Sequence, residues 1–273
     1  MQTNATVQEI RIVQVGFGSL GAEIFKVLHK NKKIKLIGVM DIDKSKVGKD
    51  CGVLLNKKKI GVRIVKTLDD IPSKPDIIIH ATTSDINTAH SQIKQIAKKK
   101  ISIISTCEEL VYPYGKNKKV AKKIHQLAKK HRIRILAVGV NPGFLMDSML
   151  LMLSSLCTNI RKITVTRVVD IAKRRKSLQK KMCIGFTISQ FNKIKNSSGH
   201  VGLAESAMMI ANSLNLKLKL DKKTRPILAK KNFSSNGIKV KRGTVSGIHH
   251  RLIGKAKNSE FLELNLHMYV GAK

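Results

Sequence analysis

Residues 10–21 read IRIVQVGFGSLG, and this stretch decides the fold of the first half of the chain. Its first six residues are mostly β-branched, which is typical of a strand buried inside a parallel sheet. Gly16, Gly18 and Gly21 follow with the spacing GxGxxG, and the apolar pattern of residues 20–29 predicts an amphipathic helix. A strand, a glycine turn and a helix in this order are typical of a Rossmann-type dinucleotide-binding domain, which we expect here.

Each glycine of the turn has its own physical role in such a domain. Gly16 permits the tight turn, Gly18 lets the backbone approach a pyrophosphate, and Gly21 lets helix and strand pack closely. The N–H groups and the dipole of the helix N-terminus then hold the phosphates. A glycine turn that binds nothing is the alternative. The cofactor-binding residues predicted in this turn are Gly16, Phe17, Gly18, Ser19, Leu20 and Gly21.

Asp41 follows a second predicted strand at 34–40, about 20 residues beyond the last glycine, where a carboxylate accepts hydrogen bonds from the adenosine ribose. An acidic residue there favours NAD, because it repels the 2′-phosphate of NADP. Lys44 and Lys46 lie just beyond it and would weaken that repulsion. We expect NAD as the cofactor and leave NADP open.

The rest of the first half alternates strand and helix patterns. Continuous β-branched runs between amphipathic helices indicate a doubly wound parallel sheet with both faces covered. The fold class is therefore α/β, with a dinucleotide-binding Rossmann domain at 1–143. Further strands are predicted at 62–65, 76–80, 101–105 and 133–138, with a basic helix at 116–131.

The second half, 144–273, has the pattern of an α+β domain with a mixed or mostly antiparallel sheet, and we assign substrate binding and oligomerisation to it. The last predicted strand runs almost to the end of the chain, so we expect that a segment which normally follows is missing. The predicted elements are helices at 144–156 and 203–214, and strands at 162–171, 238–248, 249–255 and 261–270.

The charge is strongly positive, since 53 Lys and Arg against 17 Asp and Glu give a formal net charge of +36. Such a charge attracts polyanions. The basic residues are spread over the whole chain, however, and those of helix 116–131 mostly lie opposite an apolar stripe. Basic and aromatic residues are not interleaved as in proteins that bind single-stranded nucleic acid. We expect no specific nucleic-acid partner.

The sequence also bears on membrane association, metal binding and cellular location. No apolar run is long enough for a transmembrane helix, so no membrane partner is expected. The four cysteines are scattered without a CxxC pair, which is typical of reduced thiols in a cytoplasmic protein. The histidines lack the spacing of metal ligands; His249 and His250 are neighbours on a predicted strand and would face opposite sides. No metal site is predicted.

Two segments follow predicted strands at the sheet edge where ligands bind in such folds. The small side chains of Ala81, Thr82 and Thr83 would let a dinucleotide lie against the backbone. A helix N-cap by Thr83 or Ser84 is the competing interpretation, and both can hold together.

Glu108 and Glu109 form the second segment and are candidates for general acid–base work. One carboxylate would be enough, and its neighbour could cap a helix or face solvent. Cys107 is less attractive as a nucleophile, because no histidine lies nearby in the sequence to activate it.

Polar residues at the domain junction and beyond it are candidate ligands. Asn141 is followed by Pro142 and Gly143, and its amide can form hydrogen bonds with a nicotinamide or a substrate. The alternative is that these residues form a purely structural hinge. Arg167, Arg174 and Gln179 belong to a polar cluster in which arginine forks suit the capture of a carboxylate.

Three motifs resemble one known family: GVNPGFLMD at 139–147, RVVDIAKRRKSLQKK at 167–181 and GHVGLAES at 199–206. They are similar to the 2,4-diaminopentanoate dehydrogenases and the related native amine dehydrogenases, which share a fold with dihydrodipicolinate reductase. The resemblance runs over essentially the whole chain. It implies oxidation of an amine by NAD(P) to an imine, which water converts to a ketone and ammonia. For the diaminopentanoate enzymes the product is 2-amino-4-oxopentanoate.

The same resemblance implies roles for single residues. The family's catalytic glutamate corresponds to the CEEL segment, with Glu108 preferred to Glu109. Asn141 and Gly143 would lie by the nicotinamide. The residues expected to bind the carboxylate and distal amine of the substrate are Arg167, Arg174, Gln179 and His200.

Two other functions stay open. One is an imine or C=C reductase similar to dihydrodipicolinate reductase, whose mark would be a His/Lys pair on the substrate, and we find no clear one. The other is a catalytically degenerate dinucleotide-binding protein. Proteins of this fold commonly pair through the second-domain sheet, so we expect a homodimer that acts on a small amine or amino acid.

Overall fold

The computed structural model describes residues 9–174, 176–195 and 202–272. It divides into two compact units, Met1–Gly139 and Val140–Lys273. The division falls four residues before the domain boundary that the sequence suggests.

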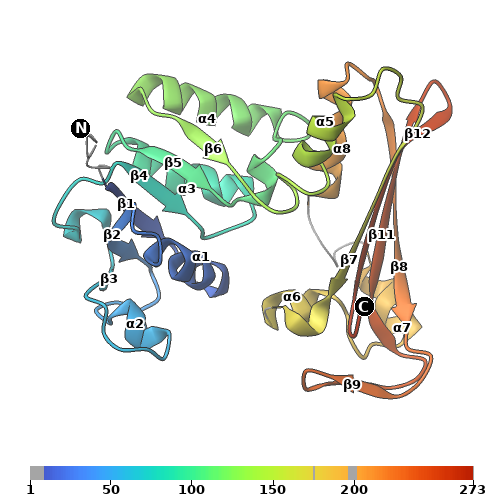
Figure 1. Ribbon diagram of the computed structural model, residues 1–273, viewed down its shortest axis with the longest axis horizontal. Helices are drawn as coiled ribbons and strands as arrows, with labels where there is room; N and C mark the ends of the chain where they lie inside the picture. Colours follow the sequence, from blue (N-terminus) through green and yellow to red (C-terminus); the bar gives the residue numbers. More distant parts are fainter. Residues whose placement is uncertain (1–8, 175, 196–201, 273) are drawn as a thin grey trace, which may run out of the picture. The chain divides into compact units, whose positions relative to one another are not determined.

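Unit 1 is built on a six-stranded parallel sheet with the order β3-β2-β1-β4-β5-β6 (Figure 1). The order reverses between β1 and β4, which creates the crevice at the carboxyl ends of the strands where dinucleotides bind in such folds. The predicted doubly wound sheet is confirmed. Its strands are β1 (Ile10–Val15), β2 (Ile34–Met40), β3 (Ile64–Val65), β4 (Ile77–His80), β5 (Ser102–Ser105) and β6 (Ile135–Ala137).

Helices cover both faces of this sheet. One hydrophobic cluster joins the central strands to α3 and α4, and a second joins the opposite face to α1 and α2. The strands can therefore be apolar on both sides, which explains why their sequences read as continuous β-branched runs. The helical segments are α1 (Ser19–His29), α2 (Cys51–Leu54), η1 (Leu68–Asp70), α3 (Ile86–Ala97), η2 (Glu108–Leu110) and α4 (Lys118–His131).

Unit 2 contains a four-stranded mixed sheet with the order β7-β12-β11-β8, in which only β7 and β12 run parallel. One face is covered by helices, with Phe191, Leu203 and Ile210 fully buried against it. The elements are α5 (Ser148–Ser154), β7 (Ile163–Asp170), η3 (Ile171–Lys173), α6 (Lys176–Lys181), α7 (Ile188–Ile194), α8 (Leu203–Ser213), β8 (Lys219–Leu228), β9 (Phe233–Ser235), β10 (Ile238–Val240), β11 (Val245–Ala256) and β12 (Ser259–Tyr269).

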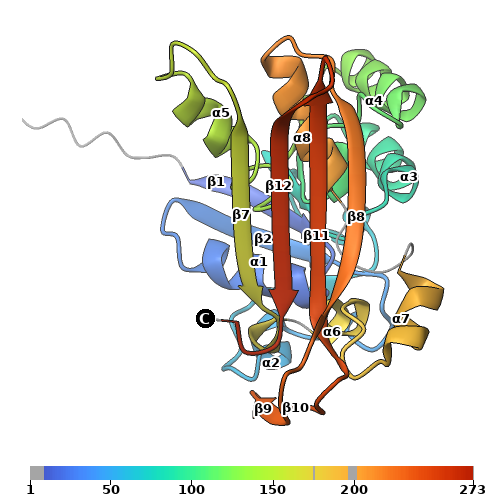
Figure 2. The same cartoon turned by 90° about the vertical axis from the view of Figure 1, so that its right-hand side faces the viewer.

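The other face of this sheet is open: none of the described helices crosses it in Figure 2. Along β12, Leu264 and Leu266 are buried on the covered face, while the alternate residues are half-exposed. His250 is buried and His249 is not, so the expectation that these neighbours face opposite sides is confirmed. The ring of His249 stacks instead on His267 of β12, with centroids 3.9 Å apart.

Two element predictions for unit 2 are wrong, and one strand was not predicted. The helix expected at 144–156 is only Ser148–Ser154, because the Asp147 side chain accepts from the backbone N–H groups of Gly143 and Ser148 and turns the chain before the helix. No break separates Ile248 from His249, since β11 is continuous. Strand β8 went unpredicted because it is an edge strand rich in lysine and tolerates Pro226.

No helix in the described part of the chain has the length and apolarity needed to cross a membrane.

Candidate functional site

A cavity of about 920 Å³ lies in unit 1 at the carboxyl ends of β1, β2 and β4, where the strand order reverses. Six of the residues predicted to bind a dinucleotide line it. These are Gly16, Gly18, Asp41, Ala81, Thr82 and Thr83. The remaining lining residues include Ile42, Lys46, Thr67, Leu68, Asp69, Thr88, Gln92, Gln95, Lys98 and Lys99. We refer to this cavity as the crevice.

The three glycines of the turn differ in the space around their Cα atoms. Two of them have no room for a Cβ, whereas Gly18 has. Gly16 has a φ of +99°, and a Cβ there would collide with the carbonyl of Ala81. A Cβ on Gly21 would collide with the carbonyl oxygen of Gly16. Gly18 differs, because a Cβ on it would meet no atom within 4 Å and its φ of −74° suits any residue. The space beside Gly18 is open to the crevice.

A buried glutamine holds this turn in shape. Gln14 on β1 is fully buried, and its Nε2 donates to the carbonyl oxygens of Gly16 at 2.8 Å and Gly21 at 2.9 Å. These contacts join the first and last glycines of the turn. Gln14 is a site residue that was not predicted, because in the sequence it is only a polar interruption in an apolar strand.

The first turn of α1 fits an anion. Gly18 is the N-cap residue and offers no side chain to the backbone N–H groups, and the first turn contains no acidic residue. Ser19 and Leu20 are exposed. An uncapped helix N-terminus with its dipole is a suitable partner for a phosphate.

Asp41 is fixed by the backbone around it. Its Oδ2 accepts from the N–H of Phe17 at 2.6 Å, and its Oδ1 accepts from the N–H of Asp43 at 2.9 Å. Lys46 Nζ lies 4.0 Å from Asp41 Oδ2 and 3.0 Å from Asp43 Oδ2. The ring of Phe17 packs edge-on against Phe25 in the core, so Phe17 contributes its backbone to the turn and not its side chain.

The loop after β4 forms a wall of the crevice. The N–H of Ala81 donates to the carbonyl of Val15 at 2.8 Å, which fixes this loop beside the glycine turn. The N-cap of α3 is Asp85, whose carboxylate accepts from the N–H of Thr88 at 2.8 Å. The alternative that Thr83 or Ser84 caps this helix is therefore wrong, and Thr83 accepts from the N–H of Asp85 instead.

A polar cluster lies behind this wall and was not predicted. His80 is fully buried, and its Nδ1 lies 2.9 Å from Ser105 Oγ. Its Nε2 lies 2.7 Å from Gln92 Oε1 and 2.9 Å from Thr82 Oγ1. Burial lowers the pKa of His80, which favours the neutral form of the ring. We call these four residues the His80 cluster.

The two glutamates of CEEL differ in their surroundings. Glu109 Oε2 accepts from the N–H of Ile86 at 3.1 Å, at the first turn of α3, and its Oε1 pairs with Lys116 Nζ at 2.9 Å. Both oxygens of Glu109 thus hold structure together. Glu108 is half-buried at the start of η2. Cys107 before it is buried, which raises the pKa of its thiol to about 11 and makes it a poor nucleophile.

In unit 2, two of the motifs quoted above pack against each other. Asp147 Oδ2 accepts from the N–H of Gly143 at 2.8 Å and from Ser206 Oγ at 2.6 Å. Gly202 lies so close to the ring of Pro142 that a Cβ would collide with it. The amide of Asn141 is buried, and neither its nitrogen nor its oxygen has a hydrogen-bond partner within the described residues. Such an amide is available to a ligand.

The structure brings together some of the residues that were predicted to bind the substrate. Arg167 is half-buried on the covered face of β7, where burial and then the nearby charge of Arg174 lower its pKa. It forms no ion pair with an acidic residue of the described chain, and a carboxylate ligand would supply one. Gln179 Nε2 donates to the carbonyl of Arg174 at 2.6 Å and so holds that loop. His200 lies outside the described residues.

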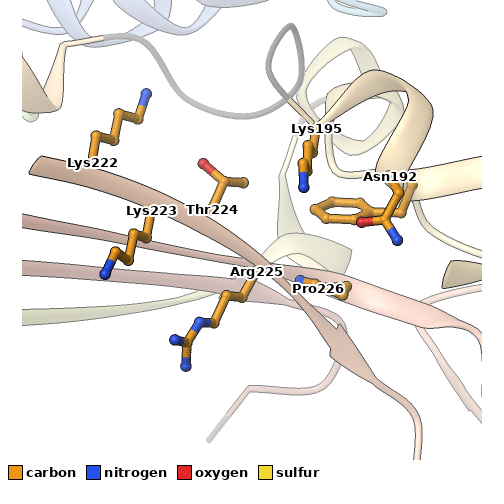
Figure 3. A pocket seen from close by; sticks show the side chains of 8 residues that line it. Asn192, Lys195, Lys222, Lys223, Thr224, Arg225 and Pro226 are labelled. Carbon is orange, nitrogen blue, oxygen red and sulfur yellow. The ribbon is translucent and has the colours of Figure 1, made fainter.

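A second cavity, of about 520 Å³, lies in unit 2 between α7 and β8 (Figure 3). Its charged side chains are all basic: Lys195, Lys222, Lys223 and Arg225. None of the predicted site residues lines it. Because it contains no carboxylate for proton transfer, we assign it no catalytic role. The residues described contain no group of three metal-ligating side chains either.

Comparison with known proteins agrees with this arrangement. Residues 10–138 match the family model of the dihydrodipicolinate reductase N-terminus, and residues 144–269 match that of the 2,4-diaminopentanoate dehydrogenase C-terminal domain. The second half of the chain is therefore similar to the C-terminal domain of the 2,4-diaminopentanoate dehydrogenases. The enzyme of that name from Acetoanaerobium sticklandii is 29% identical over 223 residues, which are 78% of this chain and 62% of the relative. The chain thus spans about three fifths of the length of this curated relative.

Solved structures share the fold. An amine dehydrogenase from Mycobacterium smegmatis superposes with a TM-score of 0.82 at 20% identity, covering 96% of this chain and 80% of its own. GenD2 from gentamicin A biosynthesis, solved in complex with NAD, has a TM-score of 0.54 at 13% identity and covers 95% of this chain and 66% of its own. The predicted fold class is confirmed by these likenesses.

Proposed function

We propose that this chain is an NAD-dependent amine dehydrogenase that deaminates 2,4-diaminopentanoate or a similar amine to the ketone and ammonia. The observation that carries the proposal is the crevice, in which the open space at Gly18, the uncapped first turn of α1 and the fixed carboxylate of Asp41 meet. The family likeness of both halves supports the choice of an amine as substrate.

The residues of the crevice fit a dinucleotide. The N–H groups at Ser19 and Leu20 would hold the pyrophosphate, for which Gly18 leaves room. Asp41 would accept from the adenosine ribose, which favours NAD. Lys46 is close enough to Asp41 to offset part of its charge, so NADP is a weaker alternative.

When bound, NAD supplies the acceptor for the hydride of the amine carbon. Glu108 would take the proton that the amine nitrogen loses, stabilise the positive iminium and activate the water that replaces the nitrogen. The products are the ketone, ammonium, the reduced cofactor and one proton, which Glu108 would pass to solvent. Glu108 is preferred to Glu109 on the family resemblance, and both oxygens of Glu109 are engaged in structural contacts.

Arg167 and Arg174 are our candidates for the carboxylate of the substrate. The half-buried guanidinium of Arg167 has another cation nearby and no acidic partner in the described chain, an environment that favours a bound anion. Asn141 and Gly143 are proposed for the nicotinamide, since the buried amide of Asn141 has donors and an acceptor to offer. Gln179 and His200 remain proposals from the family resemblance.

We also propose that the chain forms a cytoplasmic homodimer through the open face of the unit 2 sheet. Val168 is 48% exposed on this face, beside the stacked rings of His249 and His267. Light scattering on the purified protein tests this: we expect a dimer, and a monomer in the variant Val168→Arg. A wild-type monomer would contradict the proposal.

The activity is tested by following NADH formation with NAD and 2,4-diaminopentanoate, with simple alkyl amines and NADP in parallel. We expect turnover of the diamine and a preference for NAD. NADH binding without turnover of any amine would instead favour a dinucleotide-binding protein. Reduction of a cyclic imine without amine oxidation would favour the reductase.

A further inference from the structure

The His80 cluster has one consistent arrangement of hydrogens. Ser105 Oγ accepts from the N–H of Cys107 at 3.2 Å and lies 2.9 Å from His80 Nδ1. On the other side of the ring, Nε2 faces the oxygen of Gln92, which only accepts. The hydrogen of the neutral ring therefore lies on Nε2, and Nδ1 accepts from the hydroxyl of Ser105.

This arrangement fixes the carboxamide of Gln92. Its Oε1 accepts from His80 Nε2 at 2.7 Å and from the hydroxyl of Thr82 at 2.6 Å. With the oxygen held twice, the amide nitrogen points away from His80. Gln92 and Thr82 both line the crevice, and the hydrogen bonds of the Gln92 side chain to described residues all involve its oxygen.

We propose that His80 is a positioning residue that acts through Gln92, holding the carboxamide so that its N–H groups donate to an acceptor atom of the bound dinucleotide. The inference rests on the proposed cofactor. Gln92 lies in the second turn of α3, and His80 is the last residue of β4. The cluster therefore joins two elements that border the crevice. The donor is useful there because a ligand acceptor would otherwise lose its bonds to water.

The test is the dissociation constant of NADH, measured by fluorescence titration, which needs no amine turnover. Gln92→Met removes the amide and keeps the length of the side chain, and we expect NADH binding about five- to tenfold weaker. His80→Phe keeps a ring but loses both nitrogens, and we expect a similar loss. His80→Gln, which retains an N–H donor, should bind NADH within about twofold of the wild type.

A double-mutant cycle separates this role from general damage to the fold. If His80 acts through Gln92, the variant His80→Phe/Gln92→Met binds NADH no more weakly than Gln92→Met alone. Losses that multiply would overturn the proposal, and so would a Gln92→Met variant with wild-type affinity. If His80→Phe does not fold, Ser105→Ala is used in its place in the same cycle, because it removes the hydroxyl that sets the ring hydrogen.

The wild-type titration distinguishes the two levels of inference. A wild-type protein that does not bind NADH overturns the proposed cofactor and this inference with it. A wild-type protein that binds NADH, together with His80 and Gln92 variants of unchanged affinity, overturns this inference alone.

Discussion

The carboxylate of Asp41 accepts a hydrogen bond from the backbone N–H of Phe17, with 2.6 Å between Oδ2 and the nitrogen. The contact joins the end of β2 to the middle of the glycine turn. Asp41 also lines the crevice, so one side chain both shapes the turn and faces the space proposed for the dinucleotide. The proposed ribose and phosphate sites are therefore held in a fixed position relative to each other by the protein alone.

Replacing Asp41 with serine should shift the cofactor preference toward NADP. The charge that repels a 2′-phosphate is lost, while Lys46 remains nearby. We expect the ratio of kcat/KM for NADP to that for NAD to rise about tenfold, which is about 1.4 kcal/mol. Asp43→Asn is the control, because Asp43 does not line the crevice. An unchanged ratio in Asp41→Ser would contradict the placement of the ribose.

Gly18→Ala and Gly21→Ala should separate binding from folding. A Cβ at Gly18 meets no protein atom, so this variant should melt like the wild type but bind NADH at least about tenfold more weakly. A Cβ at Gly21 collides with the carbonyl of Gly16, and we expect a loss of about 1–3 kcal/mol in stability. Thermal unfolding and NADH titration of both variants check this. Equal effects of the two on NADH binding, with equal stability, would refute it.

Unit 1 could be predicted from sequence because its signals are local. Buried parallel strands are apolar on both faces, and β2 was predicted with its observed bounds at 34–40. Strand β8 could not be predicted in the same way, because LDKKTRP at an edge has no apolar alternation to detect. The predicted helix 144–156 was too long, because apolar content does not reveal the capping role of Asp147.

The candidate site, too, could be predicted only where its signals are local in the sequence. The glycine turn and Asp41 are defined by short spacings, and the structure brings them together in one crevice. Gln92 and Ser105, which contact His80, and Ile86, which contacts Glu109, lie 12 to 25 residues away from them in sequence. They meet only through the register of β4 with β5 and the position of α3, which residue spacing does not encode.

Glu263 should make the stability of unit 2 depend on acid pH. Its Oε1 accepts from Arg251 Nε at 2.7 Å and from Asn265, and these bonds lower its pKa from 4.5 to about 2. A lowered pKa stabilises the fold above the ordinary value, and this stability is lost as the pH falls toward 2. In the Glu263→Gln variant, the free energy of unfolding should therefore fall by about 1 kcal/mol less than in the wild type over this pH range.

Thermal unfolding between about pH 5 and pH 2 measures it. The control is Glu260→Gln, which removes a nearby carboxylate that lies 3.6 Å from Lys162 and acts on Arg251 by its charge but not by a hydrogen bond. If the melting temperature of Glu263→Gln falls with acid as steeply as that of the wild type, the ion pair does not contribute.

Cysteine reactivity should be confined to one thiol. Cys51 and Cys107 are fully buried, and burial raises their pKa values to about 12 and about 11. Cys183 is buried as well, while Cys157 is exposed. Mild alkylation of the folded protein at neutral pH, read by mass spectrometry, should therefore label Cys157 alone. Rapid labelling of Cys107 would reopen its role as a nucleophile.

Glu108 and Glu109 provide a matched pair that tests the catalytic assignment. Glu108→Gln removes the proposed proton acceptor, and we expect kcat to fall by about 10²–10⁴ at saturating NAD while NADH binding stays near the wild-type value. Glu109→Gln keeps an oxygen that can accept from the N–H of Ile86 and loses only the ion pair with Lys116. It should therefore retain kcat within about threefold, since the pair has an exposed lysine and is expected to contribute little to turnover. Steady-state kinetics of both variants decide between the two residues, because the opposite order of effects would make Glu109 the catalytic carboxylate.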